Sequence, residues 1–252
     1  MTASMAGALV SALGMVMVAV AAVAIVRRLY RPAYRWFWVG AALWTVAVVP
    51  KLIVGALITV PMLTALNSLL PFQVYVVAGG VCMGVLSAVF EMGVTIGAGL
   101  IWRRLGRDVP VAVGIGAGAG AFEALLLGLA ALCAMVAVSM GVHGTEEVGA
   151  QISTLAESTP LFWLIAPTER VTAVLAHTAS RALVLLSIGG RRWWMAAAGV
   201  AIFTALDGIA GVVQVSDAMN RMSLWLVELS LAPAGVAALA ALVWVHRRER
   251  GA

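Results

Sequence analysis

The chain has 252 residues, of which 63% are apolar and 11% are charged, and its formal net charge is +5. Its mean hydropathy is +1.05. Soluble domains carry about 25% charged residues, so this composition excludes a soluble enzyme and predicts an all-α polytopic membrane protein. Cys82 and Cys133 both lie in apolar segments, which argues against a disulfide framework and against a thiolate metal site.

Seven segments are long and apolar enough to cross a bilayer, and we expect them to form a single transmembrane domain over residues 1–252. They cover residues 5–26, 36–63, 74–102, 109–140, 162–188, 193–213 and 222–245. We interpret the first as a retained helix, because no small-residue cleavage site precedes its closing arginines. Pro50 should kink or break the second. Residues 141–160 are expected to form a polar loop.

The arginines indicate how the chain sits in the membrane. Clusters of arginine follow spans one, three, five and seven, whereas only Arg221 lies in a loop of the other side. Positive charge favours the cytoplasm, so the seven-helix bundle should have its N-terminus outside and its C-terminus in the cytoplasm. We expect a multi-pass protein of the plasma membrane with the lipid bilayer as its surroundings. Arginines in short loops are a topology signal, so no nucleic-acid partner is expected.

A stripe of small residues opens the fourth span at Gly114, Gly116, Gly118 and Gly120. It lacks the Lys-Ser/Thr of a phosphate-binding loop. The overlapping small-xxx-small spacing predicts instead that this helix approaches its neighbours closely.

The fifth span contains ionisable groups, which are costly inside a bilayer and usually functional. At 3.6 residues per turn, Arg170, His177 and Arg181 fall within roughly 40° of one another, with Glu169 about 80° from His177. We interpret this face as a functional site. The alternative is a polar seam that fixes helix packing, with Arg181 snorkelling to the cytoplasmic surface.

Further charged residues of other spans lie at the same depth. Glu91 and His177 precede the cytoplasmic ends of their spans by about 17 Å, and Glu123 and Asp207 follow theirs by about 21 Å. Lys51 reaches a similar level. Such a set could bind a divalent metal such as zinc in a hydrolytic site, relay protons or ions, or fix helix register through paired charges.

Four motifs then resemble, in order, the YhfC family of intramembrane metalloproteases, which is related to the CPBP (CAAX-type) glutamic membrane peptidases. They are Phe90-Glu91-Met92-Gly-Val-Thr95, the segment 118–128 with Glu123, Glu169-Arg170 with His177, and Asp207. The family has a second Glu, an Arg and a His where this chain has Met92, Thr95 and Phe203.

The resemblance implies catalytic roles for Glu91, Glu123, Glu169, Arg170, His177 and Asp207. Glu91 would activate a water, and His177 would bind a metal or stabilise an oxyanion. Glu91, His177 and Asp207 are the expected ligands of a divalent metal. Zinc is the candidate, because histidine nitrogen and carboxylate oxygens are among its usual ligands.

We therefore expect an intramembrane metalloprotease acting on a membrane protein or peptide, with activity reduced or lost through the replacements at Met92, Thr95 and Phe203. The alternative is a non-catalytic scaffold that binds a partner or lipid. A small proton-coupled transporter is a third hypothesis, but seven unrepeated spans lack the two halves such folds often show.

Overall fold

The computed structural model describes residues 3–250, and every regular element in that range is a helix. Seven helical segments are long and apolar enough to cross a membrane. This confirms the prediction of an all-α, multi-pass integral membrane protein. The single-helix spans are α1 (Ala3–Tyr30), α6 (Val109–Ser139), α9 (Trp193–Val215) and α11 (Leu224–Arg250).

The other three spans are composite. The second consists of α2 (Tyr34–Val54), η1 (Gly55–Thr59) and α3 (Val60–Leu69), and the third of α4 (Phe72–Ser87), η2 (Ala88–Met92) and α5 (Gly93–Ile101). The fifth consists of η4 (Phe162–Leu164) and α8 (Ile165–Gly190). Short helices η3 (Arg103–Gly106), α7 (Glu146–Ser158) and α10 (Ala218–Arg221) lie between spans.

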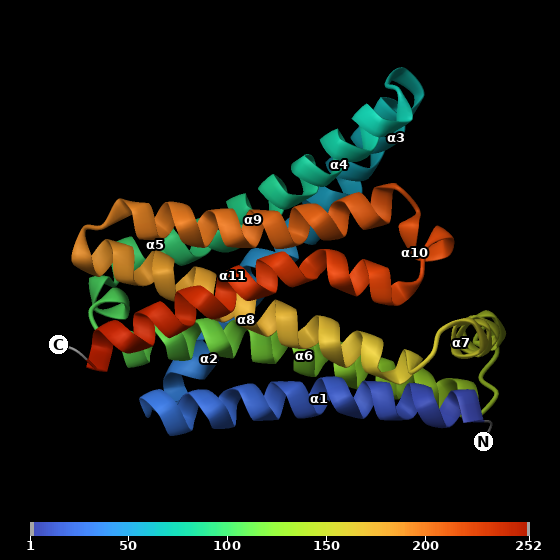
Figure 1. Cartoon of the computed structure of the whole chain (residues 1–252), viewed down its shortest axis with the longest axis horizontal. Coiled ribbons are helices and arrows are strands. Elements are labelled where there is room, and N and C mark those ends of the chain that lie inside the picture. Colours follow the sequence, from blue (N-terminus) through green and yellow to red (C-terminus); the bar gives the residue numbers. More distant parts are fainter. Residues whose placement is uncertain (1–2, 251–252) are drawn as a thin grey trace.

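Helix α8 is the centre of the bundle. Among the 18 most apolar consecutive residues of each span, 78% are buried in the fifth span and at most 28% in any other. It packs against α1, α6, α9 and α11, and Figure 1 shows it running between α1 and α6 on one side and α9 on the other. Polar side chains on α8 are therefore shielded from lipid by neighbouring helices.

The glycine stripe of α6 allows this close packing on two faces. A Cβ added at Gly116 would lie 2.6 Å from the carbonyl oxygen of Thr178, and one at Gly120 would collide with α8 one turn earlier. Gly118 faces α2 instead, where a Cβ would overlap the backbone of Phe37. Small residues thus bring three helix backbones together, as the small-xxx-small spacing predicts.

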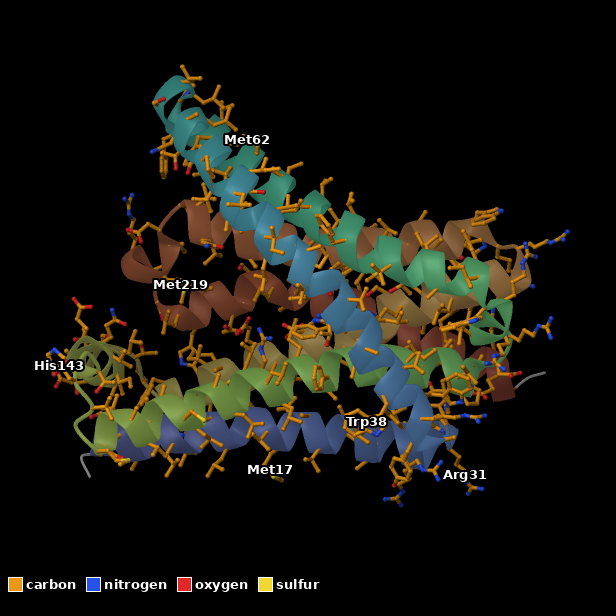
Figure 2. All side chains as sticks on the ribbon, turned by 180° about the vertical axis from the view of Figure 1, so that it is seen from behind. Met17, Arg31, Trp38, Met62, His143 and Met219 are labelled. Atoms are coloured by element: carbon orange, nitrogen blue, oxygen red, sulfur yellow. The ribbon has the colours of Figure 1, made fainter. Side chains whose placement is uncertain are left out.

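The second span is not broken at Pro50. The helix continues to Val54 and then through the π-helical turn η1 into α3. Figure 2, seen from behind, shows this long segment crossing obliquely in front of α6, from Trp38 to Met62. A second π-helical turn, η2, contains Glu91. Single π turns inside α-helices are frequent at functional sites.

The expected polar loop at residues 141–160 contains the helix α7, so that prediction was wrong. Glu146 and Glu147 lie in its first turn, where carboxylates favour the positive end of the helix dipole. α7 packs against α1 at the end of the bundle that carries the N-terminus (Figure 1). In Figure 2, His143 lies at this end and Arg31 at the opposite one.

Candidate functional site

The six residues predicted to form a site belong to one network of ion pairs and hydrogen bonds through the middle of the bundle, here called the charge network. In order of contact, its members are Asp207, Lys51, Glu91, Arg181, His177, Glu123, Arg170 and Glu169. These residues come from α2, η2, α6, α8 and α9. The structure thus brings together side chains from five spans.

Glu91 is a buried carboxylate of this network with a cation at each of its two oxygens. Its side chain is 2% exposed, and Oε1 lies 2.5 Å from the ammonium of Lys51. Oε2 lies 2.8 Å from the guanidinium Nη2 of Arg181. Each carboxylate oxygen therefore has its own cation, and protonation of Glu91 would remove the charge that both ion pairs require.

The partners of His177 determine where its proton lies. Nδ1 lies 2.6 Å from Nη1 of Arg181, and Nε2 lies 2.8 Å from Oε2 of Glu123. A guanidinium can only donate, so Nδ1 must accept and Nε2–H must donate to Glu123. His177 is thus assigned as the neutral tautomer protonated at Nε2, with both nitrogens engaged.

Glu123 accepts hydrogen bonds from three donors. Nη1 of Arg170 lies 2.7 Å from Oε1, while Nε1–H of Trp44 donates to Oε2 over 3.0 Å and His177 contacts the same oxygen. Arg170 also donates to Glu169 through Nη2. Arg170 is therefore paired within the protein, between two carboxylates.

Asp207 is the most loosely held member. Its Oδ2 lies 3.9 Å from Nζ of Lys51, which also donates to Oγ of Ser87 over 3.3 Å. Lys51 and Asp207 are 21% and 26% exposed, and both line a cavity of about 740 Å³ between the second span, α4 and α9. Within the network, Glu91 is thus buried, whereas Asp207 is accessible from this cavity.

Three partners were not among the residues given catalytic or metal-binding roles: Lys51, Arg181 and Trp44. Arg181 does not snorkel, because its side chain is fully buried. Its position one turn after His177 on the same face was a visible signal for the pair, and the depth of Lys51 was another. The contribution of Trp44 had no signal in the sequence, since one tryptophan among nine in this chain is not distinctive.

The three positions that differ from the family motifs carry uncharged side chains, and Met92 and Phe203 form an apolar wall of the site. Met92 and Phe203 are fully buried and belong to one hydrophobic cluster with Val184. Phe203 packs edge-on against the ring of His177, with centroids 5.1 Å apart. Thr95, also fully buried, donates its hydroxyl to the backbone carbonyl of Glu91. These side chains supply packing where the motif would supply charge.

The donor set does not fit a zinc ion. Among residues 3–250, no group of three His, Cys, Asp or Glu residues could hold a metal, so the predicted site of Glu91, His177 and Asp207 is not formed. The lone pair of His177 accepts from Arg181, and both oxygens of Glu91 face cations that would repel a divalent ion. Lys51 lies between Glu91 and Asp207, where it supplies positive charge itself.

A family model described as YhfC intramembrane metalloprotease matches residues 14–231, which include every member of the charge network. No curated protein and no solved structure matches the chain.

Proposed function

The chain belongs to the YhfC intramembrane metalloprotease family, and we propose that it is a member whose hydrolytic activity is reduced or lost. The observation that carries the proposal is the position of the Lys51 ammonium, 2.5 Å from Glu91 and 3.9 Å from Asp207. Lys51 and Arg181 neutralise the carboxylates that zinc would otherwise use. The proposal includes a relationship to the CPBP peptidases, which the order of the motifs supports.

The expected consequence is weak zinc binding by the native protein. Zinc in a hydrolytic site takes three protein ligands and an open position, and His177 is the one histidine of the charge network. We expect detergent-purified protein to retain far less than one zinc per chain by elemental analysis. His177→Ala should leave that content unchanged. One zinc per chain, lost in His177→Ala, would overturn the proposal.

A second measurement tests whether the replaced residues are responsible. Phe203→His, Met92→Glu and Thr95→Arg together restore the family motifs, and we expect this triple variant to bind more zinc than the native chain. Phe203→Leu is the matched control, since it changes the same buried position without adding a nitrogen. A triple variant that folds and binds no more zinc than the control would show that these three replacements do not limit metal binding.

A non-catalytic scaffold is the second candidate function, and the extent of the network favours it. Its ion pairs link the second and third spans to α6, α8 and α9. Paired charges inside a bundle fix helix register, because an unpaired charge at the bilayer centre costs roughly 2.5–3.5 kcal/mol on insertion scales. The same residues would then position a surface that binds a partner or lipid.

A further inference from the structure

A groove lies on the lipid-facing surface of the protein between α1 and α11, away from the charge network. Both helices pack against α8, which forms the floor of the groove with Val171, Val174 and Thr178. The groove has a volume of about 410 Å³. Its walls include Ile25 and Leu239, which are 57% and 50% exposed and so present apolar side chains outward.

The length of the groove matches one leaflet. Along α1 its lining begins at Val18 and ends at Tyr30. At 1.5 Å per residue this is about 18 Å, close to half of the roughly 30 Å hydrocarbon core. A narrow apolar groove of this length suits an extended acyl chain.

One end of the groove is basic and polar, unlike the rest. Tyr30, His246 and Arg247 line it there, and the rings of Tyr30 and His246 meet edge-on with centroids 5.2 Å apart. Nδ1 of His246 is buried and has no hydrogen-bond partner in the described part of the chain. Arg247 is exposed and forms no ion pair with any described residue. A buried nitrogen without a partner is costly, and a ligand that accepts hydrogen bonds and carries negative charge would satisfy both His246 and Arg247.

We propose that this groove binds an anionic phospholipid, with one acyl chain along α1 and α11 and the phosphate at His246 and Arg247. The phosphate would accept hydrogen bonds from the Nδ1–H of His246 and from the guanidinium of Arg247. Clustered arginines near a membrane surface attract anionic headgroups in the same way. The proposal goes beyond the proposed function and does not depend on whether the central site binds metal.

The test compares two lipids that differ only in headgroup charge. Dioleoyl phosphatidylglycerol or dioleoyl phosphatidylcholine is added to the detergent-purified full chain, and the retained lipid is counted by native mass spectrometry. We expect the native protein to retain the anionic lipid with about fivefold higher apparent affinity, the effect of one interfacial arginine. Equal retention of the two lipids would overturn the proposal.

Two variants and a matched control locate the binding site. Arg247→Gln should abolish most of the headgroup preference, whereas Arg248→Gln should keep it, because Arg248 stacks on Trp244 and does not line the groove. Ala22→Trp fills the groove and should lower retention of both lipids several-fold. If Arg247→Gln and Arg248→Gln weaken binding of the anionic lipid equally, the attraction is a general surface effect and the site is refuted.

Discussion

Replacing Arg181 by methionine should destabilise the protein more than any other single change in the charge network. Arg181 is fully buried, pairs with Glu91 over 2.8 Å and donates to His177 over 2.6 Å. Without it, the four carboxylates of the network have only two cationic partners, Lys51 and Arg170. Breaking a buried ion pair by removing one partner costs about 3–5 kcal/mol, which corresponds to a fall in Tm of roughly 6–20 °C for a chain of this size.

Thermal melting in detergent, followed by tryptophan fluorescence, measures this effect. The double variant Glu91→Gln/Arg181→Met should melt at a higher temperature than the sum of the two single changes predicts, because Gln removes a charge that Arg181 no longer neutralises. Arg181→Met melting within about 2 °C of the native protein would refute the reasoning. So would strictly additive effects of the two changes.

Three further outcomes are expected. Cysteine at His143, in a background without other cysteines, should react with an impermeant maleimide from outside the cell only; labelling from the cytoplasmic side would reverse the predicted topology. Gly120→Ala should lose about 1–3 kcal/mol of stability, because its Cβ would lie 3.0 Å from the Cβ of His177. Gly93→Ala is the control and should keep the native stability, because no atom lies within 4 Å of the added Cβ. Arg170→Gln should lower Tm markedly, while Arg221→Gln, in an exposed pair at 3.7 Å, should change it little; equal shifts would mean that the Arg170 guanidinium is solvated.

Most of the fold could be predicted because hydropathy and length suffice for membrane helices. All seven spans follow from apolar segments of the required length, and the glycine spacing of α6 predicted its close contacts. α7 was missed because its amphipathic pattern is too short and polar for a span. The π turns were missed because a single π turn within a continuous helix does not change the amino-acid composition of the segment.

The site was predicted in its members more than in its chemistry. Depth along each span placed Glu91, Glu123, His177 and Asp207 at one level, and the structure joins them through ion pairs and hydrogen bonds. Depth does not specify which face of a helix meets which neighbour. Lys51 therefore appeared as one more polar group at that level, and its position between two carboxylates emerged only from the packing of the second span against η2 and α9.

The substitutions and the ion pairs are physically connected. Phe203 and Met92 form an apolar wall, so these two positions supply no metal ligands beside the carboxylates of the network. A buried carboxylate without a counter-ion is costly. Lys51 and Arg181 satisfy that requirement from within the chain. Apolar residues of similar volume are often at least as stable as a buried ion pair, so stability alone does not explain why eight charged or polar side chains occupy this region. We propose that their arrangement across five spans fixes one specific helix register around the cavity beside Asp207.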